Sequence, residues 1–151
     1  MNIKIRKMKR RDIRKLSGRL READAQELMA AGNTSIESAL VHSYENSTRR
    51  YTLELDGLPM AAFGIVPETL VGDIANVWML GTPEMARIKK TFVKLSRKFI
   101  FDFLIDYPVL WNAVDCRYVS SIRWLEAMGA VFDEGSALPG FRRFVILRGT
   151  I

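Results

Sequence analysis

The stretch CRYVSSIRWLEAMGAVF, Cys116–Phe132, is the most informative part of the sequence for predicting the fold, and it follows the apolar run Pro108–Val114. The run is short and apolar, which predicts a buried strand. A helix is then expected from about Val119 to Met128. Gly129 follows as its C-terminal cap, because glycine accepts the left-handed conformation that such a cap needs. A new strand is expected to begin directly afterwards, so the stretch predicts a strand–helix–strand unit.

The rest of the chain changes between helical spacing and strict alternation, which marks its helices and strands. Asp56-Gly57 predicts a tight hairpin, and Pro83 fits the first position of a long helix with Thr82 as its N-cap. Gly32 is expected to end one helix, and Thr34 or Ser35 to cap the next. We expect strands at about 2–8, 50–55, 60–66, 74–80, 109–114, 131–134 and 141–148, and helices after Asp12, at 21–31, after Ser35, from Pro83 to before Pro108, and at 119–128.

The long helix is predicted to be amphipathic. Its apolar positions Ile88, Phe92, Leu95, Phe99 and Phe103 recur every three or four residues, whereas Lys90, Lys94 and Arg97 fall on the other side. In the following helix, Ile122 and Leu125 are expected to be buried. These patterns predict a mixed α/β fold: a mostly antiparallel sheet of about 6–7 strands with the long helix and a C-terminal helix packed on it.

The composition favours one domain, residues 1–151, since 48% of the residues are apolar and can form a sizeable core. No apolar run approaches the roughly 20 residues that span a bilayer, and no secretory signal is recognisable. One cysteine and one histidine cannot build a zinc site, and no acidic cluster has the spacing of a calcium loop. We therefore expect a soluble, intracellular, metal-free protein.

The net charge of +6 is concentrated at the N-terminus. Residues 1–15 contain eight basic residues and one acidic residue, a net charge of +7. Such a segment can attract nucleic acid or an acidic protein surface. It also fits a solvated strand and first helix turn, and no aromatic residues that could stack on bases are interleaved with it.

The strand–helix–strand ending, and the whole order of elements, resembles the GNAT superfamily of acetyl-CoA-dependent N-acetyltransferases. In that family the corresponding segment often reads NxxAIRLYRKLGF; here Tyr118 stands at the position of the asparagine and Leu125 at that of the tyrosine. The resemblance implies that a loop before the long helix would bind the cofactor pyrophosphate through backbone N–H groups. It also implies that the family's tyrosine would protonate the departing thiolate.

The loop of this chain departs from the family signature Q/R-x-x-G-x-G/A. The stretch LGTPEMAR, 80–87, has one glycine, Pro83 without a donor, and Glu84 in the first turn. A carboxylate there stabilises the free helix but would repel a bound pyrophosphate. Leu125 cannot transfer a proton, and loss of a general acid costs about 10²- to 10⁴-fold. We therefore predict a degenerate cofactor loop and no catalytic residues.

Other residues are weaker candidates for catalysis. His42 fits an exposed helix position better than a general base, and Cys116 has no histidine that the sequence links to it. Glu68 and Asp73 flank the strand at 74–80 and could serve as bases, although acidic loop residues are common. Tyr118 is expected to pack at the start of the last helix. The three tryptophans are expected in the core or a subunit interface: Trp78, Trp111 and Trp124.

Nearly the full length resembles GNAT-like phage proteins, including the internal virion protein A family of short-tailed phages. The matching stretches are LREADAQELMAAG (20–32), VWMLGTPEMARI (77–88), YPVLWNAVD (107–115) and SIRWLEAMGAVF (121–132). The resemblance implies a role in assembly of the phage head interior. It transfers no catalytic residue.

The leading hypothesis is a virion-assembly or internal virion protein on a GNAT-like fold, without catalysis, cofactor or metal. Its expected partners are phage virion or assembly proteins, a further copy of itself, and nucleic acid contacted weakly through Lys4–Lys15; no membrane is involved. We expect it in the host cytoplasm during infection and in the virion interior.

The alternative is an N-acyltransferase that uses acetyl-CoA on an amine. As the resemblance implies, Trp78, Met79 and Leu80 would then hold the pantetheine arm and Gly81 would approach the phosphate. A third hypothesis is a nucleic-acid-binding module that uses residues 4–15 together with Lys90, Lys94 and Arg97.

Overall fold

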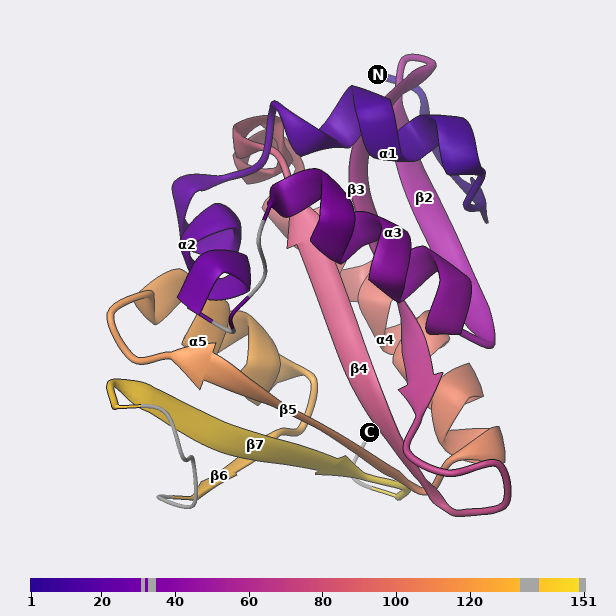
Figure 1. Ribbon diagram of the computed structural model, residues 1–151, viewed down its shortest axis with the longest axis vertical. Helices are drawn as coiled ribbons and strands as arrows, with labels where there is room; N and C mark the ends of the chain where they lie inside the picture. The colour runs from indigo at the N-terminus through magenta and orange to yellow at the C-terminus, as the bar shows by residue number, and fades with distance from the viewer. Residues whose placement is uncertain (31, 33–34, 134–138, 150–151) are drawn as a thin grey trace. The chain divides into compact units, whose positions relative to one another are not determined.

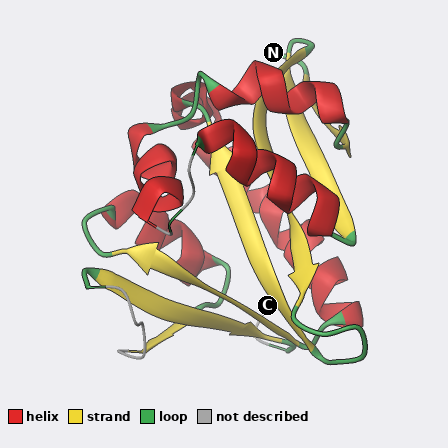
Figure 2. Ribbon diagram, in the orientation of Figure 1, coloured by secondary structure: helices red, strands yellow, loops and turns green. Residues whose placement is uncertain are grey.

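The structure is a computed structural model that describes residues 1–30, 32, 35–133 and 139–149. The described strands form a seven-stranded sheet in the order β1-β2-β3-β4-β5-β7-β6. Figure 1 labels the helices and the strands β2 to β7, and Figure 2 colours helices and strands separately. The elements are β1 (Ile3–Lys7), α1 (Arg10–Ser17), α2 (Glu22–Ala30), α3 (Ile36–Asn46), β2 (Arg49–Leu55), β3 (Leu58–Pro67), β4 (Ile74–Gly81), a 3₁₀ helix (Pro83–Ile88), α4 (Lys89–Asp106), β5 (Val109–Asp115), α5 (Val119–Ala127), β6 (Val131–Asp133) and β7 (Phe141–Leu147).

The predicted fold class is confirmed. The pairs β1–β2, β2–β3, β5–β7 and β6–β7 are antiparallel and β4–β5 is parallel, so the sheet is mixed and mostly antiparallel. By its contacts the chain divides into two compact units. Unit 1 comprises residues 1–66 and 78–87, and unit 2 comprises residues 67–77 and 88–151. Strand β4 contributes its first half to unit 2 and its second half to unit 1.

Unit 1 places α1 and α3 on its strands. Leu16 of α1 and Leu40 of α3 are fully buried and share one apolar cluster with Ala62 of β3 and Trp78 of β4. The hairpin between β2 and β3 turns at Asp56 and Gly57, whose φ angles of 52° and 83° are both positive. Paired positive φ angles match the twist of the flanking strands, so the hairpin prediction is confirmed.

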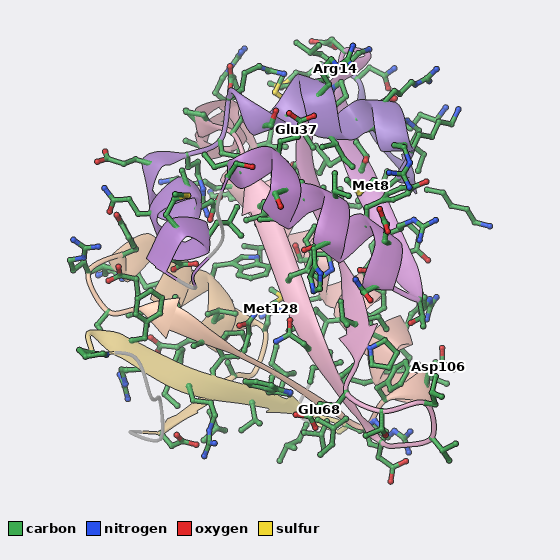
Figure 3. All side chains as sticks on the ribbon, in the orientation of Figure 1. Met8, Arg14, Glu37, Glu68, Asp106 and Met128 are labelled. Carbon is green, nitrogen blue, oxygen red and sulfur yellow. The ribbon has the colours of Figure 1, made fainter. Side chains whose placement is uncertain are left out.

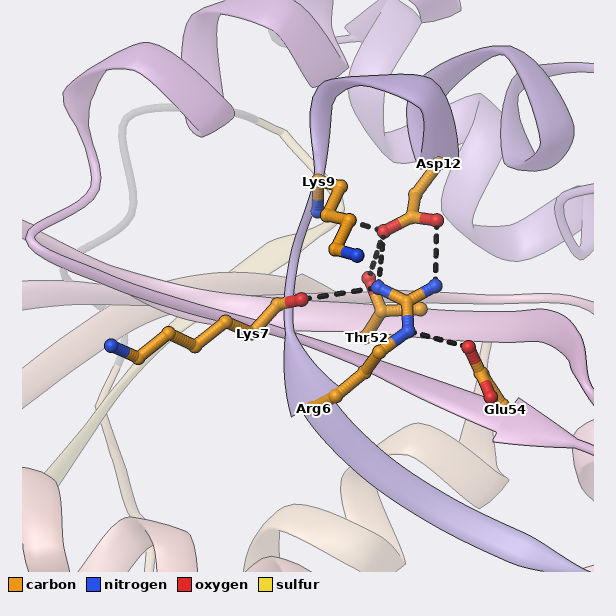
Figure 4. Close-up of polar contacts among 6 residues, drawn as sticks. All are labelled: Arg6, Lys7, Lys9, Asp12, Thr52 and Glu54. Carbon is orange, nitrogen blue, oxygen red and sulfur yellow. Dashed lines mark hydrogen bonds and ion pairs between the residues drawn. The ribbon is translucent and has the colours of Figure 1, made fainter.

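A buried ion pair joins the first strand and first helix of unit 1 (Figure 4). The Arg6 guanidinium donates to both carboxylate oxygens of Asp12, at 2.8 and 2.9 Å, and its Nε donates to Glu54. The Asp12 side chain is fully buried and also accepts bonds from the Thr52 hydroxyl and the Lys9 N–H. The sequence predicted that Asp12 precedes the helix. This was wrong: α1 begins at Arg10, and Asp12 lies within its first turn as the partner of Arg6.

Unit 2 places α4 and α5 on its strands. The rings of Phe92 in α4 and Trp124 in α5 stack with centroids 5.6 Å apart, and Arg97 donates to the carbonyl of Ala127. Met128, labelled in Figure 3, is fully buried beyond the end of α5. Gly129 follows with a φ angle of 86°, which confirms the C-terminal cap predicted for the helix at about 119–128.

The long helix differs from its prediction in where it starts. Pro83–Ile88 forms a 3₁₀ helix, and the α-helix begins only at Lys89. The predicted stripe is confirmed at Ile88, Phe92 and Phe103, whereas Leu95 and Phe99 are only half-buried. The residues buried in addition are Ser96, Ile100 and Leu104. Lys90, Lys94 and Arg97 are exposed, as expected.

Candidate cofactor site at the end of strand β4

The second half of β4 carries the four residues expected to touch a cofactor if one binds. Trp78 is only 8% exposed, and its indole Nε1 donates to the Ser47 hydroxyl at 2.8 Å. Leu80 is buried in the same apolar cluster of unit 1. Met79 is half-buried between them. The side chains of Trp78 and Leu80 therefore stabilise unit 1, which leaves the Met79 side chain and the backbone to face a ligand.

Both backbone groups of Gly81 are already bonded within unit 1. Its N–H donates to the Asp24 carboxylate at 2.8 Å, and its carbonyl accepts the N–H of Arg21 at 2.7 Å. Asp24 is 4% exposed and accepts two further bonds from the Arg21 guanidinium, each 2.9 Å. Since a carboxylate already occupies the N–H that the enzyme hypothesis offers to a phosphate, an incoming phosphate oxygen would have to displace Asp24.

Thr82, the residue after Gly81, is also held by hydrogen bonds within unit 1. Thr82 is fully buried, and both its N–H and its hydroxyl donate to the carbonyl of Met60, at 2.9 and 3.0 Å. Sequence spacing predicted Thr82 as the side-chain cap of the long helix. This was wrong, because its hydroxyl instead ties the loop to β3.

A second carboxylate stands in the first turn of the 3₁₀ helix. The hydrogen bond from its own backbone N–H is the main cause that lowers the pKa of Glu84 below the ordinary value, and Arg19 and Arg87 add to it. Glu84 lies 3.8 Å from the Arg19 guanidinium. Glu84 is therefore ionised at neutral pH, and its negative charge at this turn disfavours a bound phosphate.

The side-chain amide of Asn112 bonds backbone groups in unit 2 where the ladder between β4 and β5 ends. The parallel ladder pairs Ile74–Asn76 with Val109–Trp111. Just beyond it, the Asn112 side chain donates to the carbonyl of Val77 at 2.7 Å and accepts the N–H of Ala113 at 2.7 Å. The Asn112 side chain thus forms hydrogen bonds with the backbone of both strands next to the last pair of the ladder.

Helix α5 carries a core residue, Leu125, at the position where the GNAT resemblance implies a tyrosine. Leu125 is 5% exposed and belongs to the interior of unit 2, as predicted. Tyr118 is half-buried at the N-cap of α5, with the Arg117 guanidinium 5.5 Å from its ring centre.

The remaining candidates do not assemble into one site. His42 is exposed on α3 in unit 1 beside Asn46, whereas the exposed Cys116 belongs to unit 2. Glu68 and Asp73 are exposed at the two ends of the connection between β3 and β4. Among the described residues, no three histidine, cysteine or acidic side chains gather as metal ligands. No helix in the described part of the chain is long and apolar enough to cross a membrane.

Sequence reasoning missed Asp24 and Asn112, the two side chains that occupy the backbone groups of β4. Asp24 lies three residues after Arg21 at the start of α2, a spacing that predicts a local ion pair but not its bond to Gly81, 57 residues away. For Asn112 the sequence predicted only its place near the middle of a strand, not its hydrogen bonds.

No protein-family model matches the chain. Over 112 residues it is 32% identical to a protein of Escherichia phage T7 described as "Probable scaffold protein gp13", covering 71% of this chain and 76% of the phage protein.

Several solved structures with the same fold are described as acetyltransferases. Spermidine N-acetyltransferase from Vibrio cholerae superposes with a TM-score of 0.67 at 15% identity, covering 98% of this chain and 96% of the enzyme. Ard1 from Thermoplasma volcanium gives 0.72 at 11% identity, covering 98% and 99% of the two chains. A GNAT-family acetyltransferase from Bacillus anthracis gives 0.69 at 11%, covering 97% and 95%. Identities this low establish the GNAT-like fold alone.

Proposed function

Since the chain belongs to the family of the probable scaffold protein gp13 of Escherichia phage T7, we propose that it is a phage assembly protein that uses a GNAT-like fold without acetyl transfer. It acts by binding other virion or assembly proteins in the host cytoplasm during infection, and it enters the virion interior as an internal virion protein. A homo-oligomer is part of the same proposal.

The observation that carries the non-catalytic part is the bond from the Gly81 N–H to the buried Asp24 carboxylate. Binding a pyrophosphate at this N–H would require breaking that bond and would bring two anions together. Glu84 adds a further negative charge to the same loop, and Leu125 supplies no proton. A chain that fills these positions with its own side chains gains a fixed loop and loses the means to hold and activate acetyl-CoA.

The alternative remains an N-acyltransferase that acts on an amine with a divergent pyrophosphate loop. The shared fold favours it, because solved acetyltransferases superpose over nearly the whole chain. It requires that Asp24 leaves Gly81 when acetyl-CoA binds.

Calorimetry separates the two proposals. Acetyl-CoA and CoA are titrated into the wild-type chain and into Glu84→Gln, Asp24→Asn and the double variant, with Asp56→Asn at the remote hairpin as the matched loss of one carboxylate. We expect no binding heat for the wild type or the control. Micromolar binding by the wild type would overturn the non-catalytic proposal and direct attention to amine substrates.

Assembly is tested by genetic complementation. A phage lacking this gene is supplied with the wild-type protein or the Glu84→Gln/Asp24→Asn variant, and particles are counted by electron microscopy and by plaque titre. We expect the deletion to reduce complete particles. Unchanged particle number and infectivity without the gene would overturn the assembly role, whatever the calorimetry shows.

A further inference from the structure

The solvent-facing side of α1 is made of cations alone. The helix buries Asp12, Ile13 and Leu16. Residues follow one another every 100° or so around a helix, so the four exposed positions fall on one continuous arc of about 140°. We call this surface the α1 arc and define it by its four exposed residues: Arg10, Arg11, Arg14 and Lys15.

The carboxylates nearest in sequence and sheet do not neutralise this arc. Asp12 and Glu54 are both bonded to Arg6, the half-buried arginine of β1. Glu45 approaches Arg10 at 3.6 Å, but both side chains are more than half exposed, and such pairs contribute little. Figure 3 shows Arg14 on the outer side of α1.

The stability of the helix does not explain the whole arc. Arg14 and Lys15 lie in the last turn, where a positive charge favours the helix dipole. Arg10 and Arg11 lie in the first turn, where the same dipole disfavours a positive charge. Arg10 has partners on α3, since its guanidinium lies 5.0 Å from the ring centre of Tyr44 and 3.6 Å from Glu45. Arg11 is kept at a position that costs the helix stability, and an external anion would offset that cost.

We propose that the α1 arc binds the sugar–phosphate backbone of duplex DNA without sequence preference. Arginine and lysine neutralise phosphates and release their counterions, which gives affinity but reads no bases. This proposal assigns the contact expected for Lys4–Lys15 to a defined surface on α1 and leaves out Arg6, which is committed to its ion pairs with Asp12 and Glu54.

The composition of the arc argues against other anionic partners. Protein interfaces combine arginine with buried aromatic and apolar anchors, and the arc has arginines but no aromatic or apolar residue. A membrane-bound amphipathic helix needs a free apolar face, but Ile13 and Leu16 are packed inside unit 1. Binding of single strands relies on aromatic stacking, which the arc cannot supply.

The test is fluorescence anisotropy with a labelled 20-base-pair duplex at salt concentrations from 50 to 200 mM. We compare the wild type with a variant that replaces all four arc residues by glutamine. Each phosphate contact contributes about −0.9 to the slope of log affinity against log salt. We expect the arc variant to lose about 3 to 4 from that slope and about 10²-fold in affinity at 50 mM salt.

The matched control removes the same charge from α4 of unit 2 by replacing its four exposed lysines with glutamine: Lys89, Lys90, Lys94 and Lys98. We expect this variant to keep at least half of the wild-type slope. Circular dichroism and melting of both variants exclude unfolding as the cause. Equal losses in both variants, no binding by the wild type, tighter binding to a single strand, or equal binding to polyglutamate would each overturn the proposal.

Discussion

At the scale of single residues, the chain uses its buried carboxylates to hold its own backbone and cations. Asp12 binds Arg6, Thr52 and the N–H of Lys9, and Asp24 binds Arg21 and the N–H of Gly81. A buried carboxylate is stable only when its acceptor sites are filled. Asp12 therefore holds the start of α1 and Arg6 in place, and Asp24 holds Gly81 and Arg21 in place. Neither carboxylate remains free to act on a substrate.

We expect Asp12→Asn to lower the free energy of unfolding by about 1.5–3 kcal/mol, because it removes the buried charge that accepts two bonds from Arg6 and leaves Arg6 with Glu54 as its charged partner. Urea unfolding followed by circular dichroism measures the change. The control is Asp133→Asn, which breaks a surface ion pair with Arg143. The Asp133 side chain is 44% exposed and the Arg143 side chain 48%. That change should cost less than about 1 kcal/mol.

The pH dependence gives an independent readout of the same pair. Burial alone would raise the pKa of Asp12, but bonds from Arg6, Lys9 and Thr52 outweigh it and keep the pKa below the ordinary value of 3.8. The native carboxylate therefore binds its proton later than the unfolded one. Its contribution is complete above about pH 5 and is lost as the pH falls through the native pKa. The difference between wild type and Asp12→Asn should shrink below pH 4; a difference that grows there would contradict the ion-pair explanation.

At the scale of elements, Gly64 in β3 sets how closely β2 can approach. A Cβ at this position would overlap the carbonyl oxygen of Arg49 and lie 3.1 Å from the Trp78 ring. We expect Gly64→Ala to destabilise the chain by about 1–3 kcal/mol, since backbone rather than a flexible side chain must move. Urea unfolding again measures the loss.

Gly18→Ala is the matched control for this substitution. Gly18 follows α1 with a negative φ of −93° and has open space around its Cα. Alanine there should be neutral or stabilise by up to about 1 kcal/mol, because it restricts the unfolded chain. If both substitutions had the same effect, close packing at Gly64 would not be the cause.

The same scale shows how far the sequence could predict this molecule. Alternation and helical spacing located the strands and helices because those periods are local consequences of burying one face. The 3₁₀ helix at Pro83–Ile88 was missed, since Pro83 starts a 3₁₀ turn as well as an α-helix. The missing glycines at 80–87 predict a degenerate cofactor loop, and this stays a prediction. The hydrogen bond from the Gly81 N–H to Asp24 could not be predicted from the sequence, because it joins residues 57 positions apart.

At the scale of the whole molecule, neither unit is a continuous piece of chain. The chain passes from one unit to the other after residues 66, 77 and 87. Strand β4 supplies residues to both: Ile74–Asn76 pair with β5 in unit 2, and Trp78 and Leu80 fill the core of unit 1. Loss of order in one unit would remove the anchor of a segment of the other, so we expect the two units to unfold together. The single domain over residues 1–151 stays a prediction.

Tryptophan fluorescence can test this cooperativity, because the tryptophans are divided between the units. Trp78→Phe leaves Trp111 and Trp124 as reporters of unit 2, and the double replacement of these two leaves Trp78 as the reporter of unit 1. Within each variant we expect the fluorescence and far-ultraviolet circular dichroism midpoints in urea to coincide, as a two-state transition requires. Comparing the two probes inside one variant removes the effect of the substitution on stability. If the fluorescence midpoint precedes the dichroism midpoint in one variant and follows it in the other, the units unfold separately and the chain contains two domains.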